Sequence, residues 1–351
     1  MIEVKDLVKR YGNHAAVDHL SFTVESGQIF GFLGPNGAGK STTMNIMTGY
    51  LAPTEGQVLI EGHDIVQEPE AAKKCLGYLP ELPPLYGDMT VQEYLRFCAE
   101  LKQIPKAERE AQINRATELC HLEDVKSRLI SNLSKGYRQR VGLGQAILGF
   151  PPIMILDEPT VGLDPKQVVE IRELIRQLAR EHTVIISSHI LSEIRAVCDR
   201  VLMIRKGRLV ACDTPARLEE KLSAHNRVEL LVKADRSRAE EILAAVPQVT
   251  GHTVTGELDG TVRLEVSTAD DRREDLFRAF ARADVPLLEL RPRTATLEDV
   301  FLDLTDDDDE VAARAAALLN GGEPPAEAET ATEPAVSAED GANENEEATN
   351  P

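Results

Sequence analysis

The fold is decided by the stretch Gly34-Pro35-Asn36-Gly37-Ala38-Gly39-Lys40-Ser41-Thr42, which fits the pattern G-x-x-x-x-G-K-[ST] of a phosphate-binding loop. Glycines let backbone N–H groups converge on an anion, a lysine reaches the β- and γ-phosphates, and a hydroxyl ligates Mg²⁺. The apolar residues 29–33 predict a buried strand before the loop, and residues 42–49 predict a helix after it. The phosphates would then lie at a helix N-terminus, where the helix dipole favours negative charge. We therefore expect a nucleoside triphosphate and Mg²⁺ to be bound by Gly34, Asn36, Gly37, Gly39, Lys40, Ser41 and Thr42.

The net charge of −20 is spread unevenly over the 351 residues. Residues 306–351 hold 14 acidic residues and one basic residue, so residues 1–305 are only mildly acidic. The folded part therefore lacks the basic character of a nucleic-acid-binding protein, and we expect no nucleic-acid partner. Because residues 306–351 contain few large apolar side chains, we predict that this acidic tail is disordered.

Cysteine usage and hydropathy indicate the compartment. The five cysteines have no CxxC spacing, which favours a reduced environment and no metal site. No apolar run approaches the roughly 18 residues that a membrane span needs. The N-terminus lacks the basic and apolar regions of a signal peptide. These features predict a cytoplasmic chain that does not cross a membrane unaided.

The apolar pattern divides the chain into domains. Residues 1–219 alternate strand-like apolar runs with amphipathic helices, which predicts an α/β domain of the P-loop NTPase type with a mainly parallel sheet. Residues 90–148 show helix after helix, so we expect an inserted helical subdomain there. Residues 220–305 follow the order βαββαβ, which matches a small α+β, ferredoxin-like domain, with a last short helix at 296–304.

A second feature with chemical meaning is the pair Asp157-Glu158, which directly follows the apolar run 153–156. At the end of a buried strand, Asp157 suits Mg²⁺ coordination, and Glu158 is placed to polarise an attacking water. Taken without the phosphate-binding loop, the same pair would fit a helix or turn cap equally well. Together with that loop, the pair predicts hydrolysis of the bound nucleotide.

Further motifs show that residues 1–219 resemble the nucleotide-binding domain of the ABC ATPases. Residues 133–140, Leu-Ser-Lys-Gly-Tyr-Arg-Gln-Arg, are similar to the family signature LSGGQ-x-x-R. Residues 161–164, Val-Gly-Leu-Asp, resemble the D-loop, and residues 187–189, Ser-Ser-His, resemble the switch-histidine segment. Tyr11, in Lys-Arg-Tyr-Gly, matches an aromatic residue near the start of the domain. The order and the spacing of these motifs are those of the family.

The resemblance implies roles for these residues. The Ser134 hydroxyl and the Gly136 backbone would hold the γ-phosphate of an ATP bound to the opposite subunit, and Asp164 would belong to the D-loop. His189 would help Glu158 to orient the attacking water. Tyr11 would stack on the adenine ring. A complete site would then need two chains, so we expect a homodimer or heterodimer of ATPase subunits around two Mg-ATP.

This sequence departs from the family pattern at three positions. Lys135 and Tyr137 replace the second Gly and the Gln of the signature, but the hydroxyl and the backbone donor that contact phosphate are retained. Glu81 stands where the family usually has the Q-loop glutamine. A carboxylate can still ligate Mg²⁺, although it cannot donate a hydrogen bond as an amide does. We expect Glu81 to keep a role in metal binding and catalysis.

Residues 77–86 and 89–95, together with the C-terminal segment 295–301, resemble one branch of the family, the ATPases of ABC-2-type export permeases. The resemblance implies an ATP-hydrolysing subunit, peripheral on the cytoplasmic face of the membrane, that drives a permease on a separate chain. Loop 78–89 would receive the cytoplasmic helices of that permease.

Two other functions fit the same motifs. One is a soluble, non-transport ABC ATPase that acts on ribosomes or nucleic acid, although such relatives usually carry paired nucleotide-binding domains or a long coiled coil. The other treats the C-terminal domain as a small-molecule sensor that gates the ATPase, a role that a ferredoxin-like fold alone neither supports nor excludes.

Overall fold

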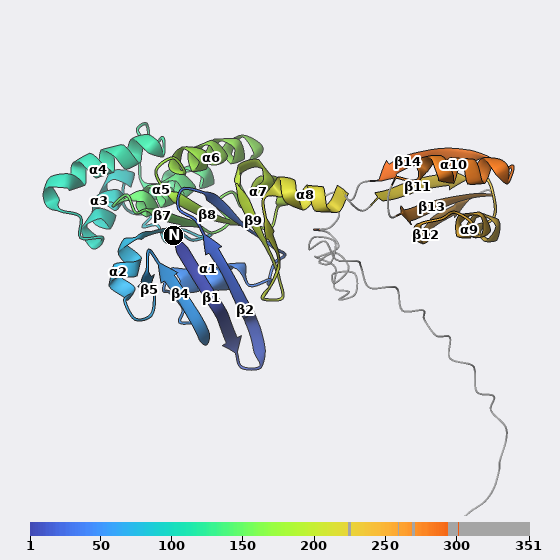
Figure 1. Ribbon diagram of the computed structural model, residues 1–351. Helices are drawn as coiled ribbons and strands as arrows, with labels where there is room; N and C mark the ends of the chain where they lie inside the picture. Colours follow the sequence, from blue (N-terminus) through green and yellow to red (C-terminus); the bar gives the residue numbers. More distant parts are fainter. Residues whose placement is uncertain (224–225, 259, 269–270, 294–300, 302–351) are drawn as a thin grey trace, which may run out of the picture.

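The chain forms two units with separate hydrophobic cores, joined through helix α8 (Pro215–Ser223) (Figure 1). The computed structural model describes residues 1–351 except 224–225, 259, 269–270, 294–300 and 302–351. The predicted helix at 296–304, apart from residue 301, and the predicted acidic tail therefore lie outside the described residues.

The first unit is built on a six-stranded sheet of order β10-β9-β3-β8-β7-β6. All neighbouring strands are parallel except β10, which runs antiparallel to β9 at one edge. The three central strands are buried at every residue, as their continuous apolar runs predict. The carboxyl ends of the parallel strands meet at one edge, where α/β proteins bind their ligands. The strands are β3 (Ile29–Leu33), β6 (Leu76–Leu79), β7 (Ile153–Leu156), β8 (Thr183–Ser188), β9 (Arg200–Arg205) and β10 (Arg208–Asp213).

A second, antiparallel sheet of order β2-β1-β4-β5 accompanies the first and was not distinguished in the sequence. It shares one core with helix α1 (Lys40–Met47) and with the parallel sheet. Within that core the ring of Phe22 lies edge-on to that of Phe32, with 5.1 Å between centroids. The strands are β1 (Ile2–Tyr11), β2 (His14–Val24), β4 (Glu55–Ile60) and β5 (His63–Asp64).

Helices cover the rest of the first unit. Residues 91–148 form three α-helices and a 3₁₀ turn, with no strand, as the helical pattern predicts. The first of these helices begins with a capping box, in which Thr90 accepts from the backbone of Glu93 and the Glu93 carboxylate accepts from Thr90. The helices are α2 (Pro69–Lys74), α3 (Val91–Leu101), α4 (Lys106–Leu119), α5 (Lys135–Ile147), α6 (Pro165–Leu178) and α7 (Leu191–Val197).

The second unit is an antiparallel sheet of order β12-β13-β11-β14 with two helices. Its core is formed by alternate residues of the strands and by the apolar faces of the helices, with Leu230, Leu264 and Phe280 fully buried. The elements are β11 (Asn226–Val232), α9 (Arg236–Ala244), β12 (Val249–Leu258), β13 (Thr261–Thr268), α10 (Arg273–Arg282) and β14 (Leu287–Arg293).

Across the described part of the chain, every helix falls short of the length and hydropathy required of a membrane span.

A tight contact between β6 and α5 gives a test of the packing. An added Cβ at Gly77 would lie 2.4 Å from the Ala146 carbonyl oxygen and 2.6 Å from the Met154 sulfur. We expect Gly77→Ala to lower the free energy of unfolding by about 1–3 kcal/mol, because this core has no room for the methyl group. Gly87→Ala is the control, since its Cβ would meet only Ser131, at 3.4 Å. Equal midpoints of guanidinium unfolding for the two variants would contradict this packing.

Candidate nucleotide-binding site

A polar pocket of about 250 Å³ lies at the carboxyl ends of the parallel strands. It brings together the loop after β3, the loop after β6, the carboxylate after β7 and the histidine after β8. The pocket thus gathers segments that are more than 100 residues apart in the sequence. Its lining residues are Ala16, Asn36, Gly37, Gly39, Lys40, Ser41, Thr42, Glu81, Glu158, Val161 and His189.

The phosphate-binding loop is shaped by glycines. Gly37 and Gly39 have φ angles of 79° and 105°, in the left-handed region that disfavours other residues. An added Cβ on Gly34 would lie 2.3 Å from the Ile204 carbonyl oxygen. Helix α1 begins at Lys40, two residues earlier than predicted, because Lys40 and Ser41 belong both to the loop and to the first helical turn. The loop therefore ends with backbone N–H groups at a helix N-terminus, the arrangement that binds phosphate.

Lys40 lies under this loop with only 6% of its surface exposed. Its ammonium donates to the carbonyl oxygens of Gly34, at 2.8 Å, and Pro35, at 3.2 Å, and lies 3.7 Å from a carboxylate oxygen of Glu158. Burial lowers the pKa of Lys40, and the nearby carboxylates of Glu158, Asp157 and Glu81 oppose that shift. A bound triphosphate would add further negative charge beside this buried ammonium, which already has Glu158 as an ion-pair partner.

Asp157 connects the phosphate-binding loop to the carboxyl end of β8 through two hydrogen bonds. One of its oxygens accepts a hydrogen bond from Ser187 at 2.5 Å and lies 3.4 Å from the Ser41 hydroxyl, which also donates to it. Hydroxyl and carboxylate oxygens are the ligands that Mg²⁺ prefers. The pair Ser41 and Asp157 therefore fits a magnesium ion beside the phosphates, with room for waters and phosphate oxygens on the pocket side.

Glu158 is held in an unfavourable backbone conformation. Its φ angle is 47°, in the left-handed region, and the next residue is Pro159, which further disfavours helical conformations of the residue before it. Such a conformation costs of order 1–3 kcal/mol and persists only where neighbours hold it. The Glu158 N–H donates to Ser187 at 2.8 Å, and the carboxylate lies 3.0 Å from Nδ1 of His189. The carboxylate is thus fixed between a lysine and a histidine at the pocket wall.

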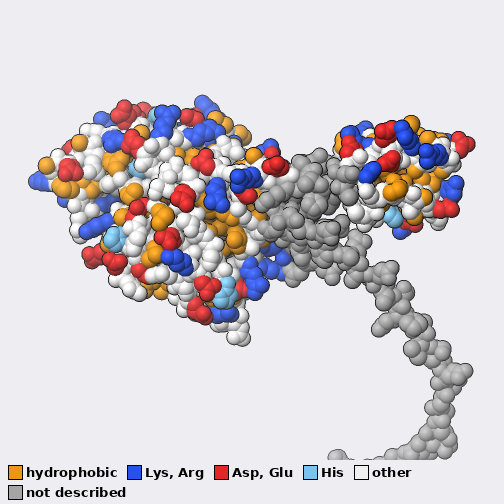
Figure 2. All heavy atoms as spheres, in the orientation of Figure 1, with side chains coloured by type: hydrophobic (Ala, Val, Ile, Leu, Met, Phe, Trp, Pro, Cys, Tyr) orange, Lys and Arg blue, Asp and Glu red, His pale blue; other side chains and the backbone are white. Residues whose placement is uncertain are grey.

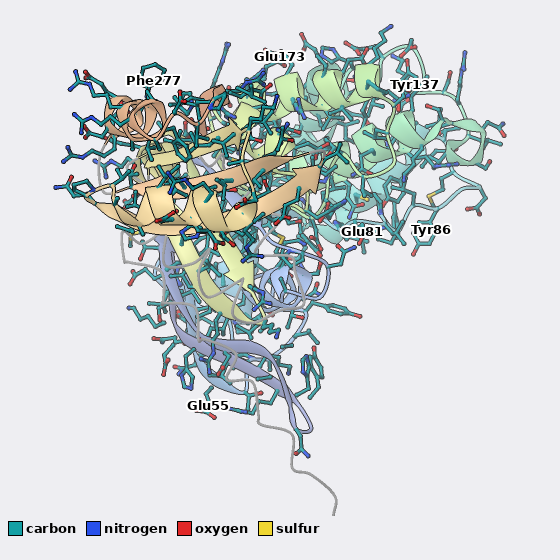
Figure 3. All side chains as sticks on the ribbon, turned by 90° about the vertical axis from the view of Figure 1, so that its right-hand side faces the viewer. Glu55, Glu81, Tyr86, Tyr137, Glu173 and Phe277 are labelled. Carbon is teal, nitrogen blue, oxygen red and sulfur yellow. The ribbon has the colours of Figure 1, made fainter. Side chains whose placement is uncertain are left out.

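Glu81, Tyr11 and Asp157, which the sequence also predicted as site residues, differ in their position relative to the pocket. Glu81 lines the pocket, and Figure 3 shows it on the same flank of the molecule as Tyr86. Tyr11 is half exposed at the end of β1, with the Lys9 ammonium 5.4 Å from its ring centroid, and is not a lining residue. The side chain of Asp157 lies behind the lining and contacts it through Ser41.

The signature residues do not share this pocket. Ser134 is the N-cap of α5 and accepts from the Tyr137 N–H at 3.4 Å, and Asp164 is the N-cap of α6. Gly136 is buried, and an added Cβ there would lie 2.7 Å from the side chain of Gln167. None of these three residues lines the pocket that contains Lys40. Within one chain, the phosphate-binding loop and the signature are therefore separate surfaces.

A second, larger hollow of about 670 Å³ lies beside the Glu81 loop. Leu76, Pro80, Leu82 and Pro84 give it apolar walls, and Lys73 and Lys102 are its charged residues. The Lys102 ammonium donates to the carbonyl oxygens of residues 146 and 148, and burial of this group lowers its pKa to about 8. We call this hollow the α2–α5 groove, since it runs between those helices.

Sequence reasoning missed three residues of the site. Ala16 lines the pocket without any chemical signal of its own, and Val161 was noted only as the first residue of the D-loop segment. Ser187 was noted only as a neighbour of His189, yet its hydroxyl bonds both Asp157 and the backbone of Glu158. A hydroxyl at the end of a fully buried strand was the available signal, because such a group needs a partner.

Comparison with known proteins gives a consistent result. A family described as "ABC transporter" matches residues 17–161. The bacitracin transport ATP-binding protein BcrA of Bacillus licheniformis is 34% identical over 87% of this chain and 97% of its own length. The linearmycin resistance ATP-binding protein LnrL of Bacillus subtilis (strain 168) is 31% identical over 87% of this chain and 98% of its own length.

Solved structures agree on the first unit. A structure described as the ATP-binding subunit of an ABC transporter is 32% identical and covers 63% of this chain and 92% of its own, with a TM-score of 0.58. The dimeric post-hydrolysis cassette MJ0796 with ADP and Pi shows the same fold at 24% identity and a TM-score of 0.55, over 61% of this chain and 98% of its own.

The crowding around Gly39 gives a test of the pocket. An added Cβ there would lie 2.5 Å from the Ala16 carbonyl oxygen, so Gly39→Ala must displace the loop. We expect binding of a trinitrophenyl-ATP probe to weaken about tenfold or more, which needs only 1.4 kcal/mol. Gly62→Ala is the matched control, because Gly62 also has a positive φ, of 83°, but has no atom near the added Cβ. Equal affinities for the two variants would contradict the role of this loop.

Proposed function

Since this chain belongs to the family of ABC transporter ATP-binding proteins, we propose that it energises an ABC-2-type exporter whose permease is a separate chain. The observation that carries the proposal is the division of the site, with Lys40, Glu158 and His189 in one pocket and Ser134 on another surface. The family's ATPase domain accounts for ATP as the nucleotide. The names of the two full-length relatives, which refer to bacitracin transport and linearmycin resistance, favour export.

Hydrolysis follows from the groups around the pocket. Lys40 lies where it can neutralise the β- and γ-phosphates, and Glu158 accepts a proton from the attacking water while His189 fixes the orientation of the carboxylate. Ser41, Asp157 and Glu81 would hold Mg²⁺, which offsets the charge of the phosphate oxygens.

We propose that two chains complete each site. Ser134 and Gly136 of one chain would cap the γ-phosphate of an ATP held by Lys40 of the other, with Asp164 at the junction and Tyr11 against the adenine. ATP then joins the two subunits, because each triphosphate would contact both. Hydrolysis removes this link and lets the dimer reopen, a transition controlled by the γ-phosphate. The partner subunit can be a second copy or a related chain.

The permease contact is assigned to the α2–α5 groove. It adjoins loop 78–89, in which Glu81 lines the pocket with Lys40 while Leu82 is 78% exposed. An apolar groove of this kind fits an amphipathic helix. Of the described residues that line it, none is acidic and two are lysines, Lys73 and Lys102. A cytoplasmic helix with one apolar face and a carboxylate would therefore complement it, and would place this chain at the cytoplasmic face of the membrane.

The second unit is assigned as a ferredoxin-like domain of structural or sensing function. Its strand order β12-β13-β11-β14, numbered within the unit, is 2-3-1-4, the order of a split βαβ motif. After β14 the chain returns to the first unit, where Phe301 packs against the core. That contact favours a structural role, and it predicts that truncation after residue 223 weakens dimerisation.

A soluble ATPase that acts on ribosomes or nucleic acid is less well supported. Two relatives matched over nearly their full length, BcrA and LnrL, carry names of transport and resistance. On the face seen in Figure 2, Lys and Arg side chains are interspersed with Asp and Glu side chains over both units. A nucleic-acid site would need a continuous basic surface.

The first prediction from this mechanism concerns Glu158. We expect Glu158→Gln to slow ATP hydrolysis by about 10²–10⁴-fold, because the general base is lost. The same variant should accumulate as an ATP-bound dimer, measured by light scattering in saturating Mg-ATP. Glu173→Gln is the control, since Glu173 is an exposed partner of Arg176 on α6 (Figure 3) and should leave both properties unchanged. A monomeric Glu158→Gln protein in Mg-ATP would argue against the shared site.

The proposed function is tested by the partners of the same variant. Glu158→Gln protein is purified from gently solubilised membranes with Mg-ATP, and its partners are identified by mass spectrometry. A multi-spanning membrane protein at near-stoichiometric yield is the expected result. Ribosomal or nucleic-acid partners without an integral membrane protein would refute the transporter function.

The groove makes a separate prediction. Treatment of that complex with a carbodiimide, which joins an amine to a carboxylate in direct contact, should link Lys73 or Lys102 to an acidic residue in a cytoplasmic segment of the permease. Lys73→Glu and Lys102→Glu should lower the yield of permease, whereas Lys106→Glu should not, because Lys106 does not line the groove. Full yield from both groove variants would place the permease contact elsewhere.

A further inference from the structure

The strained loop that carries Glu158 is held on two sides. On the strand side, the Ser187 hydroxyl accepts the Glu158 N–H at 2.8 Å. On the other side, beyond Pro159, the Thr160 hydroxyl donates to a carboxylate oxygen of Glu193 at 2.5 Å. A left-handed residue followed by a proline needs such restraints, because this strained backbone conformation persists only where its neighbours hold it.

The same oxygen of Glu193 also fixes the histidine loop. The Ser188 hydroxyl donates to it at 3.1 Å and in turn accepts the N–H of Ile190 at 3.0 Å. His189 is the residue between these two. One carboxylate oxygen of Glu193 therefore connects Thr160, in the loop after β7, with Ser188, the last residue of β8 and the neighbour of His189.

The surroundings make this connection strong. Thr160 and Ser188 are only 7% and 2% exposed, so their hydroxyls have little access to competing water. Hydrogen bonds to an ionised carboxylate are stronger than those between neutral groups. Arg172 and Glu193 line the same small cavity.

A purely local role for Glu193 does not explain these contacts. Glu193 lies in the first turn of α7, where an acidic side chain commonly accepts from the N-cap N–H of its own helix. Here that N–H, of Ile190, is already bonded to Ser188. The bonds to Glu193 come instead from side chains outside α7, on two different loops.

We propose that Glu193 is a positioning residue of the ATPase. It holds Glu158 and His189 at their 3.0 Å separation and so keeps the general base aimed into the pocket. The inference rests on the proposed hydrolysis at this site, but Glu193 lines a separate small cavity and is not among the residues that line the pocket with Lys40. Its removal should therefore affect turnover and leave nucleotide binding intact.

The test compares Glu193→Ala with Glu193→Gln in the full chain. Loss of a residue that orients a reacting group typically costs about 10–100-fold in activity, and we expect a fall of this size in kcat for Glu193→Ala with KM for ATP unchanged. Glu193→Gln should restore kcat to within about threefold, because its amide oxygen can accept both hydroxyl bonds. Ser192→Ala is the control on the same helical turn, exposed and outside the network, and should behave as the wild-type chain.

Two further variants test whether Glu193 acts by positioning the catalytic groups or only by stabilising the fold. Thr160→Val removes one donor without changing the side-chain shape and should lower kcat in the same direction. In a Glu158→Gln background, Glu193→Ala should cause little further loss, since the general base that it positions is gone. Wild-type kcat in Glu193→Ala, full additivity with Glu158→Gln, or equal losses in kcat, nucleotide affinity and Tm would overturn the inference. A wild-type chain without ATPase activity would refute the proposed function itself. An active wild-type chain with an unaffected Glu193→Ala variant would refute only the positioning role of Glu193.

Discussion

The ammonium of Lys40 and the carboxylate of Glu158 lie 3.7 Å apart, both almost fully buried, and the rest of the first unit is arranged to keep them there. The lysine must remain available to phosphate, and the carboxylate must stay ionised and aimed at water. Carbonyl oxygens of the glycine-rich loop hold the lysine, and the Ser187 hydroxyl near the carboxyl end of β8 holds the backbone N–H of Glu158. Because β3 and β7 belong to the same parallel sheet, the loop that carries Lys40 and the loop that carries Glu158 lie at the same edge of that sheet.

Much of this could be predicted from the sequence. Continuous apolar runs identify the buried strands, and the polar residues that follow 29–33 and 153–156 must then meet at the carboxyl edge of the sheet. The glycines of the loop are predictable because only glycine fits the conformations of Gly37 and Gly39. Helical periodicity likewise identifies residues 91–148 as helical, since burial of one face repeats every three to four residues.

The remainder depends on contacts that local patterns do not encode. The antiparallel β2-β1-β4-β5 sheet was missed because its two local hairpins become one sheet only through the pairing of β1 with β4, which joins residues as far apart as Ile2 and Ile60 around the phosphate-binding loop. The bonds of Glu193 to Thr160 and Ser188 depend on how two loops meet, and nothing in the spacing of these residues indicates it. The left-handed conformation of Glu158 could not be predicted from the sequence either, because residues distant in the chain offset its unfavourable conformational energy. The arrangement of the proposed catalytic residues therefore depends on contacts between loops, whereas sequence patterns predict mainly the helices and strands.

The claim that two chains build each site is tested most directly by mixing two inactive variants. Lys40→Ala removes the phosphate lysine of one surface, and Ser134→Arg blocks the signature of the other, so neither protein alone should hydrolyse ATP. Random pairing makes half of the dimers mixed, and each mixed dimer has one intact site formed across the interface. The account predicts recovery of roughly a quarter of wild-type ATPase activity on mixing equal amounts. A mixture as inactive as its components would contradict it, because each site would then be complete within a single chain.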